Sequence, residues 1–261
     1  MHDILDLDRY PLDQPGSPAW HGLVDTSRAE LAREGLFNLE GFMLPGAIQR
    51  LIGSVAARFA GEAFTHARRH NIYFRPDLTE VPSDHPAATE FETVNHTLCT
   101  DQLIGTSLLE LYNWPEFAHF LATTMGLANL YPMADPLAGV NAMAYFASNG
   151  LGWHFDRSEF TTTLLLSAPV VGGDFEYRTE LRTDTNPNYD GVGALLRGDD
   201  PAARSLTLQP GTLNVFRGKN TAHRVTPVGG NTPRYVSVFS YFDRPGVTFT
   251  AEERIGFYGR S

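Results

Sequence analysis

The chain has 261 residues, of which 42% are hydrophobic and 19% charged, so it can bury a full core and fits one large domain better than two small ones. Its 20 Lys and Arg residues against 30 Asp and Glu residues give a formal net charge of -10, which argues against nucleic-acid or anionic-membrane partners. Because the sequence has no apolar run of roughly 18 residues, no secretory signal pattern and a single cysteine, Cys99, we expect a cytoplasmic protein without disulfides.

The first half of the chain is predicted to be mainly helical. Residues 1–20, rich in Pro, Asp and Gly, favour an extended N-terminal arm. Helical spacing of apolar residues begins at Asp25 and returns after Pro45, and again over 103–111 and 116–125. Residues 21–135 are therefore expected to form helical support and a lid.

Two segments of this half stand apart. Residues 71–96 carry three prolines and weak periodicity, which indicates a long ordered loop or lid that contacts the substrate. Residues 67–70, ARRH, form the compact basic cluster of the chain. We expect this cluster to be a solvated helix end.

The second half changes to short strands separated by turns, the pattern of a β-barrel or β-sandwich. The fold class is predicted as α+β: a double-stranded β-helix, or jelly-roll, core over 136–261, with the mainly helical half packed against it in a single domain of residues 1–261. A polar insertion at 178–204 separates two strands. The predicted strands cover 141–146, 160–166, 173–177, 205–208, 212–216, 223–228 and 234–242.

His154 and Asp156 lie two residues apart at the start of an apolar strand, in GWHFDRSEFTTTLLL. Strand alternation sends both side chains to one face, where they can share one ion. His223, in NTAHRV, supplies a third donor from a distant strand. Two imidazoles and one carboxylate form a facial triad, which leaves positions of an octahedral Fe(II) ion open for a chelating co-substrate and dioxygen.

The His-x-Asp pair alone is weak evidence for a metal site. The residues that follow His223 strengthen this hypothesis. Arg234 lies one strand beyond His223. A guanidinium there can form a bidentate pair with the far carboxylate of a dicarboxylate whose 2-oxo acid end chelates the iron.

The segments HFD, PGTLNVF, AHRV and PRYVSVF, in that order, resemble the Fe(II)/2-oxoglutarate-dependent oxygenase superfamily over roughly residues 140 to 244. The resemblance implies a double-stranded β-helix fold, and it implies Fe(II), 2-oxoglutarate and O2 as cofactor and co-substrates, with release of succinate and CO2. It assigns His154, Asp156 and His223 as catalytic iron ligands and Arg234 as the 2-oxoglutarate anchor.

A narrower resemblance rests on WHFDRSEFT, SDHP, LYNWPEF and ERIGFYGR, which are similar to segments of the radical halogenases of free amino acids and their hydroxylase relatives. In the halogenases, a Gly replaces the carboxylate ligand and opens a position for chloride. Here that position is Asp156. The resemblance together with Asp156 therefore predicts a hydroxylase acting on a small molecule, a free amino acid.

Four further residues are candidates. Tyr145 can donate its hydroxyl to 2-oxoglutarate, or it is a core residue. Arg75, in the lid, can bind a substrate carboxylate, or it is a surface arginine. Arg157, just past the ligand pair, is expected where the substrate enters, and the resemblance to the halogenases implies that the residue at this place helps to hold the amino acid. Asn141 can face the substrate, or it ends a loop.

Other functions stay open at this stage. The same oxidative chemistry can end in desaturation, cyclisation or halogenation, because the outcome depends on substrate geometry. A metal enzyme that needs no 2-oxoglutarate, or a metal-free binding module, can occupy the same barrel. Arg234 argues against the former and the intact triad against the latter. The sequence does not indicate the oligomeric state.

Overall fold

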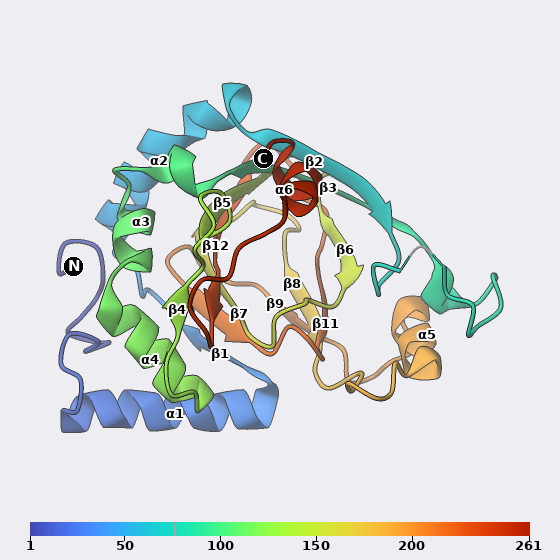
Figure 1. Cartoon of the computed structure of the whole chain (residues 1–261), viewed down its shortest axis with the longest axis horizontal. Coiled ribbons are helices and arrows are strands. Elements are labelled where there is room, and N and C mark those ends of the chain that lie inside the picture. Colours follow the sequence, from blue (N-terminus) through green and yellow to red (C-terminus); the bar gives the residue numbers. More distant parts are fainter. Residues whose placement is uncertain (76) are drawn as a thin grey trace.

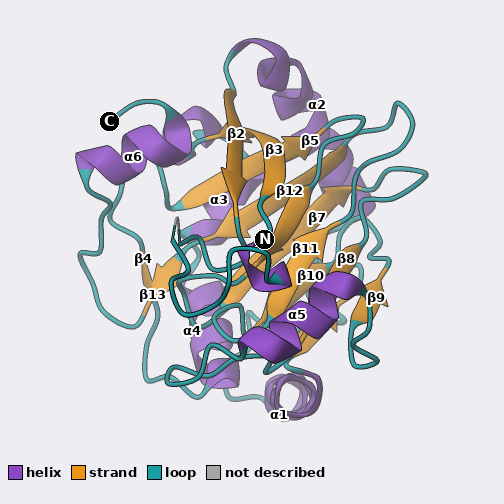
Figure 2. Ribbon diagram, turned by 90° about the vertical axis from the view of Figure 1, so that its right-hand side faces the viewer, coloured by secondary structure: helices purple, strands orange, loops and turns teal. Residues whose placement is uncertain are grey.

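The computed structural model describes residues 1–75 and 77–261. Two antiparallel sheets face each other in a jelly-roll core, and helices cover the outer side of the larger sheet (Figure 1 and Figure 2). This arrangement confirms the predicted α+β fold class. The helices are α1 (Pro18–Glu34), α2 (Pro45–Gly61), α3 (Ser107–Tyr112), α4 (Pro115–Met125), α5 (Tyr189–Arg197) and α6 (Ala251–Tyr258), with 3-10 turns η1 (Pro86–Ala88) and η2 (Thr100–Leu103).

The larger sheet is seven-stranded and the smaller is four-stranded. In spatial order, the larger sheet contains β1 (Leu36–Leu39), β10 (Leu213–Phe216), β7 (Thr161–Ser167), β12 (Arg234–Phe239), β5 (Val140–Tyr145), β3 (Phe91–Leu98) and β2 (Phe64–His70). The smaller sheet contains β6 (Leu151–His154), β11 (Ala222–Val225), β8 (Phe175–Arg178) and β9 (Arg204–Leu206), and a separate pair joins β4 (Tyr131–Pro132) to β13 (Tyr241–Phe242).

Alternation along the strands gives the larger sheet two different faces. On its outer face, Val140 and Leu164 belong to the largest apolar cluster, which includes side chains from α1, α2, α3 and α4. On its inner face, Tyr145 and Val236 pack in a cluster that Leu151 of β6 also joins. The inner face therefore looks toward the smaller sheet, and polar side chains on it can reach a site between the sheets.

The N-terminal segment differs from the extended arm expected for residues 1–20. Leu5, Leu7 and Leu12 are buried in the largest apolar cluster, and helix α1 already begins at Pro18, after the cap residue Ser17, rather than at Asp25. The Pro- and Asp-rich composition of the segment did not indicate that these apolar residues would be buried. Burying each leucine stabilises the packing of the segment against the core by about 2 kcal/mol.

The predicted lid is shorter than expected, since its last residues form β3 and the residues before it form β2. The basic cluster 67–70 is therefore part of strand β2 and not a helix end, which corrects that prediction. Neither strand shows the apolar alternation of an ordinary half-buried strand. β2 alternates between intermediate and exposed positions, and the alternate buried positions of β3 are the polar residues Thr93, Asn95 and Thr97. The connection between them carries η1, which lies beside α5 (Figure 1).

The insertion at 178–204 contains helix α5, which was not predicted. Asn188 caps its start, and its side chain accepts a hydrogen bond from the Gly191 N–H. Val192 and Leu195 of α5 are buried in the same cluster as Trp153 and Phe155. Those two side chains flank His154 in the chain, so the insertion packs behind the strand that carries it.

Within residues 1–75 and 77–261, no helix combines the length and the apolar character needed to cross a membrane.

Candidate metal centre

His154, Asp156 and His223 converge between the two strands β6 and β11. In the antiparallel register of these strands, His223 lies directly opposite His154, and their ring centroids are 4.1 Å apart. Asp156 follows the end of β6, with one carboxylate oxygen 3.3 Å from His154 Nε2 and the other 3.4 Å from His223 Nε2. One donor atom of each residue lies within 4.8 Å of the others.

Backbone carbonyls set the orientation of both imidazoles. The Nδ1 atom of His154 lies 2.9 Å from the Gly152 carbonyl oxygen, and Nδ1 of His223 lies 3.0 Å from that of Thr221. Because a carbonyl only accepts, each Nδ1 carries the proton and each Nε2 presents its lone pair to the centre.

Asp156 is held by two hydrogen bonds and by the space that a glycine leaves. Its N–H donates to the Gly218 carbonyl at 3.0 Å, and the Thr161 hydroxyl donates to Oδ2 at 2.5 Å. Gly218 leaves room for the carboxylate, because a Cβ atom there would lie 2.3 Å from Oδ2. These contacts fix the carboxylate in place and leave Oδ1 to face His154.

The electrostatics of the cluster favour a bound cation. Burial alone raises the pKa of the Asp156 carboxyl, but His223 and His154 together hold this pKa well below its usual range. Burial, reinforced by His223, lowers the pKa of the His154 imidazole. Both shifts favour the carboxylate and neutral imidazole forms that bind a metal ion.

The three side chains fit Fe(II). Two imidazoles and one carboxylate on one side of the ion leave its other positions open, which is the geometry typical of non-haem iron oxygenases. In the described part of the chain, no second group of three His, Cys, Asp or Glu side chains lies within comparable reach.

Arg234 and Tyr145 lie opposite each other on the inner face of the larger sheet. The register of β12 and β5 pairs them, and the Arg234 Cζ is 5.8 Å from the centroid of the Tyr145 ring. Arg234 is 5% exposed, and its Nε donates to the Gly173 carbonyl at 3.1 Å. Burial lowers the pKa of Arg234 and raises that of Tyr145 to about 12.

Arg234 has no acidic partner within ion-pair distance in residues 1–75 and 77–261. A buried guanidinium without a counter-ion is costly, so this position calls for an anionic ligand. The arrangement suits the carboxylate of 2-oxoglutarate.

The three residues expected to bind substrate lie in different surroundings. Arg75 pairs with Glu80 at 2.8 Å and is 46% exposed. Arg157 is next to Asp156 in the chain, but its side chain is 76% exposed and pairs with Glu253 of α6. The structure therefore does not bring these two arginines together with the metal ligands.

Both ends of the Asn141 amide form hydrogen bonds within the protein. Its Nδ2 donates to the Leu137 carbonyl at 2.7 Å, and its Oδ1 accepts from the Tyr258 hydroxyl at 3.0 Å. These bonds indicate that Asn141 holds α6 against β5.

His70 and Phe74 lie beside the cluster and were not predicted. The rings of His70 and Phe74 are 6.4 and 5.7 Å from that of His154. The signal for them was the spacing of His66, Arg68 and His70 at every second residue, which places polar side chains on one strand face.

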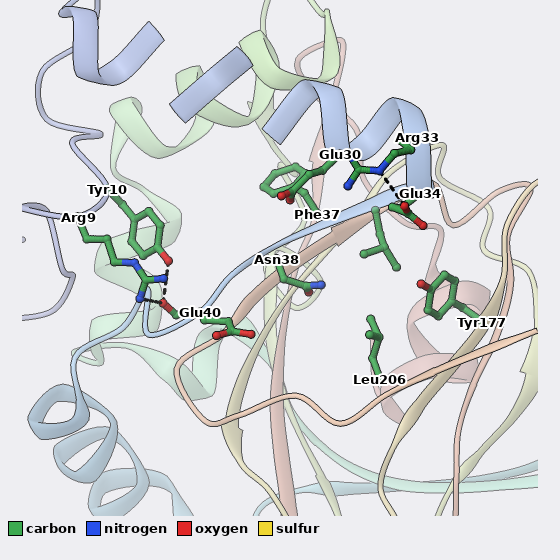
Figure 3. A pocket seen from close by; sticks show the side chains of 11 residues that line it. Arg9, Tyr10, Glu30, Arg33, Glu34, Phe37, Asn38, Glu40, Tyr177 and Leu206 are labelled. Atoms are coloured by element: carbon green, nitrogen blue, oxygen red, sulfur yellow. Dashed lines mark hydrogen bonds and ion pairs between the residues drawn. The ribbon is translucent and has the colours of Figure 1, made fainter. Parts of the chain in front are cut away.

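A surface cavity lies elsewhere. It measures about 450 Å³ and lies between α1, β1 and the edge of the smaller sheet (Figure 3). Arg33 and Glu34 in its wall pair with each other at 2.8 Å, and Arg9 donates to the Glu40 carbonyl. None of the metal-cluster residues lines it, so its size does not identify it as the active site.

Comparisons with known proteins agree with this geometry. The sequence profile of the Halogenase D family matches residues 23–251, and no curated protein sequence matches the chain. Among solved structures, the chain is similar to an oxidoreductase of the 2OG-Fe(II) oxygenase family from Burkholderia pseudomallei. The identity is 14% and the TM-score 0.53, over 90% of this chain and 94% of that chain.

Two further structures show the same likeness. The non-heme alpha ketoglutarate dependent epimerase SnoN from nogalamycin biosynthesis has 16% identity and a TM-score of 0.59, with 85% and 84% of the two chains covered. A prolyl hydroxylase from Trichoplax adhaerens has 12% identity and a TM-score of 0.54, with 87% and 94% covered. At such identities the likeness shows the fold.

The chain thus has the fold of solved 2OG-Fe(II) oxygenases, and the family profile confirms the predicted relationship to halogenases. Fe(II) and 2-oxoglutarate fit the His-Asp-His cluster and the fold as cofactor and co-substrate of an enzyme. The matched family profile covers most of the sequence, and the chain belongs to the Halogenase D family.

Proposed function

We propose that this enzyme hydroxylates an unactivated C–H bond of a small substrate, a free amino acid, with Fe(II), 2-oxoglutarate and O2, and releases succinate and CO2. The observation that carries the proposal is the carboxylate of Asp156 within the cluster it forms with His154 and His223. The unpaired Arg234 on the facing sheet supports the need for 2-oxoglutarate.

Asp156 decides between hydroxylation and halogenation. A halogenase of this kind needs an open position where a halide can bind the iron, and the resemblance described above places a glycine there. In this chain Asp156 fills the position, and Thr161 and Gly218 hold its carboxylate. We therefore propose hydroxylation although the family is named for halogenation.

Each residue has a distinct task in this proposal. His154, Asp156 and His223 hold the iron, and Arg234 holds the far carboxylate of 2-oxoglutarate, with Tyr145 as a neighbouring hydroxyl donor. Burial keeps the Tyr145 hydroxyl protonated, because it raises its pKa to about 12, so the hydroxyl can donate a hydrogen bond. The bound iron and 2-oxoglutarate supply the oxidising power that breaks the C–H bond.

The balance of the reaction is that of an oxygenase. One atom of O2 enters succinate as 2-oxoglutarate loses CO2, and the other atom enters the substrate as a hydroxyl group. The protein positions one C–H bond near the iron and keeps water away. A small metabolite as substrate agrees with a cytoplasmic location, which stays a prediction.

The test is anaerobic reconstitution with Fe(II), followed by 2-oxoglutarate, O2, chloride and a pool of free amino acids. Mass spectrometry is expected to show succinate and one amino acid that gains a single oxygen atom, and omission of Fe(II) should abolish both. A chlorinated product would contradict hydroxylation, and the absence of both bound iron and succinate would contradict the enzyme class.

A further inference from the structure

Arg68 lies on the inner side of β2, facing the metal cluster. The register with β3 pairs Arg68 with Thr93 and His70 with Phe91, and strand alternation puts Arg68 and His70 on the same side. That side faces the cluster, because the His70 ring is 6.4 Å from the His154 ring. Arg69 points the other way, is 68% exposed and pairs with Glu90.

The guanidinium of Arg68 is half-buried and has no hydrogen-bonding or ion-pair partner within residues 1–75 and 77–261. Its Cζ lies 4.5 Å from the centroid of the Phe74 ring, and that ring is 5.7 Å from the ring of His154. Stacking uses the face of the guanidinium and leaves its N–H groups free. Arg68 therefore presents free hydrogen-bond donors near the metal cluster, because it stacks on Phe74 and Phe74 lies beside the ligand His154.

The backbone at Phe74 is arranged to keep this ring in place. Phe74 has a φ of 54°, a left-handed conformation that bulky side chains rarely adopt. Asn71 stabilises it: its Oδ1 accepts from the N–H groups of Tyr73 and Arg75, and its carbonyl accepts from the Phe74 N–H at 3.0 Å. Strained residues of this type cluster at ligand-binding sites.

The charges on this side of the sheet select an anion. The inward positions of β2 and β3 are basic or neutral, with His66 and His70 beside Arg68 and with Thr93 and Asn95 on β3. Burial and the nearby charge of Arg157 both lower the pKa of Arg68, so the two guanidinium groups repel each other. A carboxylate would relieve this repulsion and supply acceptors for the free N–H groups.

Resting on the oxygenase function above, we propose that Arg68 binds the carboxylate of the substrate and that Phe74 packs against its adjoining carbon chain beside His154. The substrate is then a small carboxylic acid such as a neutral or acidic amino acid. A cationic side chain is disfavoured because the inward positions of β2 and β3 offer it no acidic partner. Arg75, the arginine expected for this task, is already paired with Glu80.

The experiment compares the wild type with Arg68→Gln and the matched control Arg69→Gln, each loaded anaerobically with Fe(II) and 2-oxoglutarate. The probes are L-norleucine, L-glutamate, L-lysine and pentylamine, which is norleucine without its carboxylate. Each dissociation constant is measured from the change in the iron-to-2-oxoglutarate absorption band. This readout reports binding without turnover.

The wild type is expected to bind norleucine or glutamate more tightly than lysine or pentylamine. Arg68→Gln should weaken binding of the carboxylate probes roughly 10- to 100-fold, the usual effect of losing a charge-assisted hydrogen bond. The same variant should leave affinity for 2-oxoglutarate and pentylamine unchanged. Arg69→Gln should bind every probe like the wild type.

Three results would overturn the inference: norleucine and glutamate affinities that survive Arg68→Gln within about twofold, preferential binding of lysine or pentylamine, or no binding of any probe. Iron content and, after O2 is admitted, substrate-free succinate release are measured on the same samples. If both are present, only the role of Arg68 fails, whereas the absence of both contradicts the oxygenase function itself.

Discussion

His223 lies directly opposite His154 in the register of β11 and β6, and each ring donates its Nδ1 proton to the carbonyl two residues before it. The hydrogen bonds that orient the two metal-binding imidazoles thus come from the backbone just before each histidine. The carboxylate of Asp156 lies outside the strand and depends on Thr161 and Gly218.

Replacing Asp156 with Ala should remove both the carboxylate ligand and hydroxylation. Losing an outer partner of a ligand typically costs 10- to 100-fold in metal affinity, so loss of the ligand itself should cost at least roughly 100-fold. Iron content and succinate release are the measurements. Asp184→Ala is the control, since Asp184 is exposed and pairs with Lys219. An active Asp156→Ala enzyme would show that the metal centre is misplaced.

Thr161→Val should weaken iron binding although Thr161 is not a ligand. The variant removes the hydroxyl that donates to Asp156 and keeps the side-chain shape, so we expect a roughly 10-fold loss of iron affinity with little change in thermal stability. Thr163→Val is the matched control two residues along the same strand face, where the hydroxyl donates to the Asn214 carbonyl. Equal iron affinities of the two variants would rule out positioning by Thr161.

Arg234→Gln should raise the KM for 2-oxoglutarate by roughly 100-fold, because a bidentate charged pair is lost. The folded protein should keep or gain stability, since the variant removes a buried charge that has no acidic partner within ion-pair distance among the described residues. Steady-state kinetics and thermal unfolding measure the two effects. Arg224→Gln, at an arginine paired with Glu176, controls for loss of a guanidinium; an unchanged KM in Arg234→Gln would contradict the anchor.

Protonation of the Asp135 carboxylate should lower the free energy of unfolding at acid pH. Burial raises its pKa, but N–H donors from Leu137 and Phe249 and the partner Arg254 outweigh burial and hold the pKa below its usual range. A lowered folded-state pKa means that the stabilisation is complete above about pH 4, the unfolded-state pKa, and is lost as the pH falls through the folded value.

Asp135→Asn should therefore lower the free energy of unfolding by about 3 kcal/mol at pH 7, the effect of breaking a buried pair. Urea unfolding at pH 7 and at acid pH should also show a weaker pH dependence than in the wild type. Asp184→Asn, on the surface, is expected to behave like the wild type. If Asp135→Asn and the wild type lose stability in parallel on acidification, another group is responsible.

Strand β6 was not predicted: His154 and Asp156 were expected at the start of the apolar strand that is β7, whereas His154 ends β6 and Asp156 lies beyond it. Most other strands of the second half could be predicted because their apolar residues alternate. β2 and β3 could not, because their inner faces look toward the metal cluster and carry polar side chains in place of a core pattern. Helix α5 was missed since Gly191 and Gly193 interrupt its sequence.

Arginine roles were the hardest to predict. The sequence shows Arg68, Arg69, Arg75 and Arg157 near one another or near the ligands, but not which of them a glutamate neutralises. Glu80, Glu90 and Glu253 pair with three of them. Those pairings depend on tertiary contacts, which the local pattern of residues does not encode.

The histidine ligands lie on β6 and β11 of the smaller sheet, whereas Arg68 and His70 lie on β2 of the larger sheet. Substitutions on the inward positions of β2 can therefore alter which molecules are accepted while leaving iron loading intact. A library varied at His66, Arg68 and His70 alone offers a route to enzymes with new substrate ranges on an unchanged oxidising centre.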